Sequence, residues 1–110
     1  MTKASKALDL LPLPAATALK QLGADIATAR KRRRQSQRDW ASRLQISIPT
    51  LRRLEQGDPS VAMGVYVTAA WLMDRHKALA SVLDPKEDMQ ALEQEVQAAN
   101  SRGSQKGRSP

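Results

Sequence analysis

Apolar residues recur at helical intervals along most of this sequence. Between residues 15 and 34, Leu19, Leu22, Ile26 and Ala29 follow one another at steps of three, four and three, which places them on one face of an amphipathic helix. Similar stripes predict further helices at about residues 37–44, 47–57, 60–72, 74–83 and 86–99. The pattern therefore predicts an all-α fold, with five helices in one domain and an additional C-terminal amphipathic helix.

Two of these helices are short and lie only a few residues apart. Ser36 followed by Asp39 resembles a capping box, and Ser47 can cap the next helix, whose first turn tolerates Pro49. The connection at residues 45–47 is long enough only for a tight turn. Two short helices with this spacing predict a helix-turn-helix unit that ends at Gly57.

The second helix of this unit has two different faces. In ISIPTLRRLEQG, residues 46–57, Leu51 and Leu54 share one face, and Arg52 and Arg53 point away from it. Arginine on an exposed face can bond phosphate or the edge of a guanine. The two arginines therefore serve either a partner or the solubility of the chain.

Prolines and composition mark the ends of the folded part. Pro12 and Pro14 disfavour helix before residue 15, Pro85 ends the fifth helix, and the last eleven residues contain no aliphatic side chain. We therefore expect a flexible arm at residues 1–14, a helix-turn-helix domain at 15–85, a C-terminal helix at 86–99 and a disordered tail at 100–110.

The formal net charge of +7 is concentrated in the first part of the chain. Residues 1–60 hold 12 Lys and Arg against 5 Asp and Glu, whereas residues 61–110 hold 6 of each kind. Such asymmetry favours a polyanionic partner, either nucleic acid or an anionic membrane surface.

The residue types needed for metal or covalent chemistry are scarce. The sequence has no cysteine and one histidine, His76, so the usual zinc ligands are not available. It has no glycine-rich phosphate loop and no converging nucleophile and base, so we expect no cofactor, no metal and no enzymatic activity. Because it also lacks a membrane-spanning apolar run and a secretory signal, a cytoplasmic location is expected.

Residues 36–57, SQRDWASRLQISIPTLRRLEQG, resemble the Xre or lambda-repressor-like helix-turn-helix family. The family pattern is Ser or Thr then Gln, an apolar residue and Ala, followed by Ser, Thr, an aliphatic residue and Glu-x-Gly. The matching residues are Gln37, Trp40, Ala41, Ile46, Ser47, Thr50, Leu51, Leu54, Glu55 and Gly57. Gln45 departs from the pattern, because the family commonly has glycine at this left-handed turn, and glutamine should cost some stability there.

The wider frame is similar to the short HipB-like antitoxins, which pair with HipA-type kinase toxins. The similarity lies in LG.DI..AR.RR at residues 22–33, GDPSVAMGVYVTAAWLMD at 57–74 and LDP at 83–85. It covers about residues 18–88. The resemblance implies an antitoxin that neutralises a HipA-like kinase and regulates its own operon.

The resemblance also implies roles for individual residues. The helix that begins at Ser47 corresponds to the recognition helix of the major groove, and the helix that begins at Gln37 crosses the DNA backbone. Arg30 is implied to pair with Glu55. Independently of the resemblance, Trp40 lies on the apolar face of its helix and is expected in the core, whereas Trp71 fits either the core or a dimer seam. The expected DNA-binding residues are Gln37, Arg43, Ser47, Ile48, Pro49, Thr50, Arg52, Arg53, Arg33 and Arg34.

These features together predict a homodimeric transcriptional repressor that binds a palindromic operator in bacterial DNA, as the antitoxin of a HipA-like kinase. Two alternatives stay open. A stand-alone phage or host repressor would share the DNA-binding features and lack the toxin partner. A basic protein or RNA interaction module would instead dock an acidic partner and bind random and cognate duplexes equally.

Overall fold

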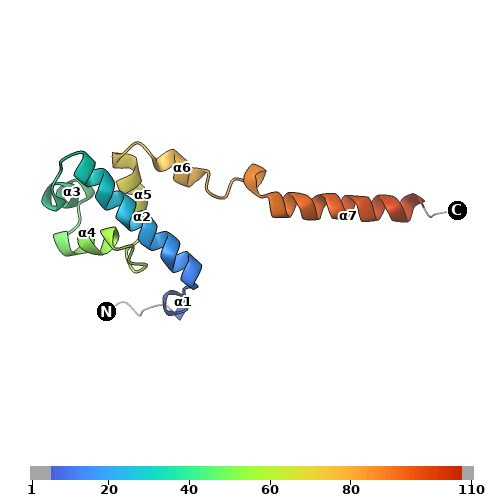
Figure 1. Cartoon of the computed structure of the whole chain (residues 1–110), viewed down its shortest axis with the longest axis horizontal. Coiled ribbons are helices and arrows are strands. Elements are labelled where there is room, and N and C mark those ends of the chain that lie inside the picture. Colours follow the sequence, from blue (N-terminus) through green and yellow to red (C-terminus); the bar gives the residue numbers. More distant parts are fainter. Residues whose placement is uncertain (1–5, 108–110) are drawn as a thin grey trace. The chain divides into compact units, whose positions relative to one another are not determined.

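The computed structural model describes residues 6–107, with side chains to residue 103, and these residues form helices and turns without a strand (Figure 1). The elements are α1 (Lys6–Asp9), α2 (Leu13–Arg32), α3 (Gln37–Leu44), α4 (Ile48–Glu55), α5 (Met63–Leu72), α6 (His76–Ala80), the 3-10 helix η1 (Pro85–Glu87) and α7 (Met89–Gly107). The all-α class predicted from the apolar pattern is confirmed. The chain divides into two compact units, Met1–His76 and Lys77–Pro110, so the helix expected at 74–83 does not belong wholly to the first unit.

Helical structure begins earlier than the sequence predicted. α1 lies inside the expected flexible arm, whose first five residues are outside the described part, and α2 starts at Leu13 rather than at residue 15. The physical reason is the position of the prolines. Pro12 caps α2, and Pro14 lies in the first turn, where its missing N–H would have no acceptor within the helix.

The helix-turn-helix unit forms as its capping residues predict. Ser36 Oγ accepts a hydrogen bond from the backbone N–H of Asp39 at 3.1 Å, and α3 begins at the next residue, Gln37. Ser47 Oγ accepts from the backbone N–H of Thr50 at 3.2 Å and caps α4. Each serine thereby satisfies one of the donors that a helix start leaves open. Gln45, between the two helices, has a left-handed backbone with φ of 55°.

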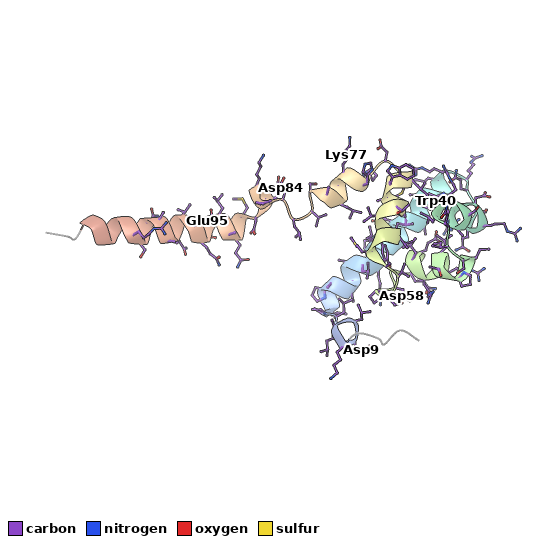
Figure 2. All side chains as sticks on the ribbon, turned by 180° about the vertical axis from the view of Figure 1, so that it is seen from behind. Asp9, Trp40, Asp58, Lys77, Asp84 and Glu95 are labelled. Atoms are coloured by element: carbon purple, nitrogen blue, oxygen red, sulfur yellow. The ribbon has the colours of Figure 1, made fainter. Side chains whose placement is uncertain are left out.

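The core lies where α4 packs on α2 and α3, and where α3 packs on α5. Trp40 is fully buried among these helices (Figure 2). The buried apolar cluster consists of Ile26, Trp40, Ala41, Leu44, Leu51, Leu54, Val61, Tyr66 and Ala69. Stripes on four helices thus meet in one core, which holds α4 in a defined orientation.

Two glycines bring α2 and the end of α4 into backbone contact. A Cβ atom on Gly23 would lie 2.4 Å from the backbone nitrogen of Gly57. A Cβ on Gly57 would lie 2.4 Å from the carbonyl oxygen of Leu19, and Gly57 also has a left-handed φ of +71°. Neither position has room for a side chain, so the glycine that closes α4 is required by both space and conformation.

The fourth helix, predicted from about residue 60, begins later, at Met63. Ser60 does not cap a helix; its backbone N–H and its hydroxyl both donate to Asp58 Oδ1, at 2.8 and 2.7 Å. This local turn, labelled at Asp58 in Figure 2, delays α5 to Met63. The Tyr66 hydroxyl in turn donates to the carbonyl oxygen of Asp58 at 2.7 Å and ties α5 to the turn.

The second unit contains η1 and α7. Asp84 Oδ1 accepts from the backbone N–H of Lys86 at 2.9 Å, and Asp88 Oδ1 accepts from that of Ala91 at 3.1 Å near the start of α7. The helix continues to Gly107, through residues expected to belong to the tail, because adding a residue to a formed helix is much easier than starting a new helix. Residues 108–110 of that tail lie outside the described part. Within the described part, no helix has the length and apolarity needed to span a membrane.

Candidate nucleic-acid interface

α4 buries one face and exposes the other. Leu51 and Leu54 are fully buried, whereas Arg52 and Arg53 are exposed. Pro49 is also exposed, in the first turn of the helix. The helix therefore presents two guanidinium groups from a rigid position, because the buried leucines on either side of them fix its orientation.

Ile48 does not belong wholly to the outward face, where the sequence placed it. Its side chain is half-buried and packs against the core cluster. As the first residue of α4, it points partly back toward the bundle. Its apolar surface contributes to packing, and only the remainder is accessible to a partner.

A buried ion pair joins α2 to α4. Arg30 Nε donates to Glu55 Oε2 at 2.6 Å, and Arg30 Nη2 donates to Glu55 Oε1 at 3.1 Å. The remaining Arg30 nitrogen, Nη1, donates to the carbonyl oxygen of Gln35 at 3.0 Å. Both charged side chains are more than nine-tenths buried, at 9% and 8% exposure. Such a bidentate pair has a defined geometry and holds α2 against α4, which are the first and third helices of the expected family layout.

Gln37 extends this ion pair to the exposed surface. Its Nε2 donates to Glu55 Oε1 at 3.0 Å, and its Oε1 accepts from Arg52 Nε at 3.4 Å. A continuous chain of contacts therefore runs from Arg30 through Glu55 and Gln37 to Arg52. Because Glu55 holds the amide nitrogen, the Gln37 carbonyl faces the exposed arginine, and that arginine is held beside the start of α3.

Thr50 connects the cap of α4 with Arg53. The Ser47 hydroxyl donates to Thr50 Oγ1 at 2.9 Å, and Arg53 Nη2 donates to the same oxygen at 3.1 Å. Ser47 thus uses its proton inside the protein, so its role as a cap competes with its expected role as a phosphate donor. Thr50 accepts both bonds and keeps its own hydroxyl proton for a partner.

Three other predicted residues lie outside this network. Arg43 is exposed, and its Nη1 donates to Gln35 Oε1 at 3.1 Å. Arg33 Nη1 donates to a carbonyl of its own helix, that of Ala29, at 3.0 Å. Arg34 is exposed with a left-handed φ of 54°. Among the described residues, no hydrogen bond ties Arg33 or Arg34 to α4.

Two residues of this surface were missed in the sequence. Gln35 accepts a hydrogen bond from the indole Nε1 of buried Trp40 and another from Arg43, so one amide satisfies a core donor and positions an exposed cation. A buried indole N–H needs a hydrogen-bond acceptor, so the sequence could have predicted that Trp40 has one, but not that Gln35 supplies it. Arg38 is exposed in the first turn of α3, directly after Gln37, and adds a further cation there.

The pKa values of Asp58, which follows α4, and of Tyr66, on α5, are shifted from their usual values. The hydroxyl and then the backbone N–H of Ser60 stabilise the Asp58 carboxylate and lower its pKa, with a smaller contribution from the charge of Arg53. Burial raises the pKa of Tyr66 to about 12, and the nearby Asp58 charge adds to this effect. Tyr66 is therefore a neutral hydrogen-bond donor at physiological pH.

The described residues contain no group of three or more His, Cys, Asp or Glu side chains arranged to hold a metal ion. What the surface offers is a set of guanidinium, amide and hydroxyl donors on and around one protruding helix. Such donors bond phosphate oxygens and the edges of bases.

A short helix that exposes arginines, preceded by a second short helix across a tight turn, defines a helix-turn-helix DNA-binding domain. Residues 21–80 match the family model described as a helix-turn-helix domain, and the chain belongs to this family. Membership indicates DNA binding and a role in transcriptional regulation. The comparisons with curated proteins and with solved structures gave no match for this chain.

Proposed function

We propose that this protein is a sequence-specific transcriptional repressor that binds DNA as a homodimer and reads the major groove with α4. One observation carries the proposal. The buried leucines of α4 and the Arg30–Glu55 pair fix a helix whose outward side presents Arg52, Arg53 and a hydroxyl donor. A groove-reading helix needs this combination of a rigid mount and outward donors.

The contacts within the interface suggest different tasks for the two arginines. Arg52 is held by Gln37, on the helix that would cross the DNA backbone, which favours a phosphate contact. The hydrogen bond of Arg53 to Thr50 stays within α4 itself, and although the Asp58 carboxylate also interacts with its charge, its other nitrogens can reach a base edge. Arg53 is therefore the better candidate for bidentate contact with guanine.

A homodimer would explain how a protein whose reading helix has only eight residues can recognise a specific DNA site, because two such helices read it together. Two copies related by a two-fold axis would place their α4 helices in successive major grooves, about 34 Å apart, on a palindrome. Arg33, Arg34, Arg38 and Arg43, all exposed, would add phosphate contacts around each half-site.

The antitoxin role is the more specific part of the proposal. It is supported by the similarity of residues 22–33, 57–74 and 83–85 to the HipB-like antitoxins. A cytoplasmic location on the bacterial nucleoid follows from a DNA target. Co-purification of this protein with a HipA-like kinase, with loss of the kinase activity in the complex, tests this part. A kinase that stays active in an equimolar mixture would remove the antitoxin role and leave the repressor.

The DNA-binding proposal is tested by measuring affinity for duplex DNA and for structured RNA over a range of salt concentration. If a dimer contacts about eight phosphates, the logarithm of affinity falls with the logarithm of salt with a slope of about −7. We expect a selected duplex to bind far more tightly than a random duplex. Equal affinity for both, with tighter binding to RNA, would contradict the proposal and favour an RNA-binding module.

A further inference from the structure

The outward face of α5 is apolar although nothing in its own unit covers it. Met63 and Trp71 are each 60% exposed, and Val67 between them is 36% exposed. These residues are spaced four apart, so they form one stripe along the helix, opposite the buried side chains of Tyr66 and Ala69.

This face carries little polarity besides the indole N–H of Trp71, which needs an acceptor when it is covered. α5 contains no charged residue, and the one hydroxyl on its outward side, that of Thr68, already donates to the Gly64 carbonyl at 2.8 Å. Gly64 lies at the edge of the stripe, and a Cβ atom there would meet nothing within 4 Å. A neighbouring helix could therefore approach closely here, with the indole N–H of Trp71 as the donor that the pairing must satisfy.

The stripe is also symmetric about its centre. Met63 and Trp71 each lie four residues from Val67, so a two-fold axis at Val67 would place Trp71 of one copy beside Met63 of the other. A thioether beside an aromatic ring is a favourable contact. The two Val67 side chains would meet on the axis. Such self-complementarity is what an interface between identical copies requires.

We propose that the outward face of α5, formed by Met63, Gly64, Val67, Thr68 and Trp71, is the surface through which two copies of this chain associate. The inference rests on the proposed function as a dimeric repressor and names the seam that the function needs. A second copy is favoured over another partner because the stripe matches itself under two-fold symmetry and carries no charge to select a different protein.

The size of the surface sets the strength of association. The three apolar side chains expose roughly 300 Å² per copy, or roughly 600 Å² in a pair, whereas a stable interface buries about 1,000 Å² or more in total. Each copy also carries a net charge of +7, which opposes pairing until it is screened or neutralised. Free dimers should therefore be weak, should strengthen with added salt, and should form fully on adjacent DNA half-sites.

The two tryptophans allow this to be measured on the full chain. Trp40 is fully buried, whereas Trp71 is exposed in the free domain, so acrylamide quenching of tryptophan fluorescence reports on Trp71. We expect Trp71 to become protected as protein concentration and salt rise, in step with a doubling of mass in sedimentation equilibrium. Protection that stays constant while the mass remains that of a monomer would overturn the proposal, because the chain itself would then cover the face.

Two glycine substitutions provide a matched pair. Gly64→Gln adds a side chain at the seam, and Gly103→Gln adds the same side chain to α7, at another position where a Cβ meets nothing within 4 Å. We expect Gly64→Gln to weaken self-association at least about tenfold and Gly103→Gln to leave it unchanged. Because glutamine is a better helix former than glycine, Gly64→Gln should keep or raise the melting temperature, so a loss of pairing cannot be attributed to unfolding.

The seam and the repressor function fail in different ways. If Gly64→Gln and Trp71→Gln both pair like the unmodified chain while DNA selection still recovers a palindrome, the repressor stands and α5 is not its seam. If Gly64→Gln abolishes pairing but the unmodified protein selects no DNA sequence, the seam stands and the proposed function falls.

Discussion

Gln45 is one of three non-glycine residues in the described part of the chain that have a left-handed backbone, with Arg34 and Asp74. It closes α3 with φ of 55°, in the left-handed region that residues with a side chain adopt at a cost. The family resemblance pointed to this position because glycine is common there. Local strain at a turn is thus one of the features that a sequence pattern can reveal.

Gln45→Gly should stabilise the domain by about 1 kcal/mol, because glycine adopts the left-handed conformation without strain. Chemical denaturation followed by the fluorescence of buried Trp40 measures the change. Ser42→Gly, in the interior of the same helix, is the control and should instead destabilise by about 0.5 kcal/mol. A destabilised Gln45→Gly protein would show that the Gln45 side chain makes a contribution larger than the strain.

The raised pKa of Tyr66 predicts that the folded state loses stability at high pH. Its folded-state pKa is about 12, above the value of about 10 expected in an unfolded chain, so the neutral form favours the folded state. That contribution is fully present below pH 10 and is lost as the pH rises toward 12. Because Tyr66 is the single tyrosine, tyrosinate absorbance follows its titration directly.

Tyr66→Phe provides the comparison for this pH dependence. It removes the hydrogen bond to the Asp58 carbonyl, which should cost about 1 kcal/mol at neutral pH. Thermal stability of this variant should fall less steeply between pH 10 and 12 than that of the unmodified chain. If the thermal stability of both proteins falls equally with pH, or if the tyrosinate midpoint lies near pH 10, Tyr66 is more exposed to water than its burial indicates.

Arg53→Ala tests the assignment of a base contact. Removing a bidentate contact should weaken binding to the selected site by about 1 to 3 kcal/mol and relax the preference at one base pair. Arg52→Ala is the matched variant, and it should weaken selected and random duplexes equally. If Arg53→Ala also weakens both equally, Arg53 contacts phosphate and the specificity lies elsewhere on α4.

At the scale of elements, the orientation of α4 depends on one buried ion pair. Arg30→Met leaves the Glu55 carboxylate buried without its cation and should destabilise the fold by about 3 to 5 kcal/mol. The double variant Arg30→Met/Glu55→Met should recover much of this loss, because no charge remains unpaired. Denaturant midpoints of the unmodified chain, Arg30→Met, Glu55→Met and the double variant complete the cycle. A double variant as unstable as Arg30→Met would show that the pair contributes through more than charge.

The elements differ in how far the sequence could predict them. Ser36 and Ser47 are local caps followed by clear apolar stripes, so the starts of α3 and α4 follow from a few adjacent residues. Ser60 looked like the same signal, but Asp58 captures its donors two residues away, and this competition is invisible to a spacing rule. The start of α2 was missed because Pro14 is tolerated in a first turn, and the end of α7 because a formed helix extends through polar residues.

At the scale of the whole molecule, charge and recognition are concentrated in the first unit. The apolar pattern and the arginine positions were sufficient to identify the class of surface, but not how its side chains are connected. The chain of contacts from Arg30 to Arg52 passes through Gln37 and depends on three helices meeting. Gln35 and the outward face of α5 were likewise visible only when burial was known.

The most direct test of the account is the selection of bound duplexes from a random pool at physiological salt, with the purified protein alone. A dimeric repressor should recover a palindrome with half-sites about one helical turn apart, because two copies of α4 in successive major grooves require this spacing. Salt-sensitive binding without any enriched sequence would contradict it, because α4 would then be part of a generic polyanion-binding surface.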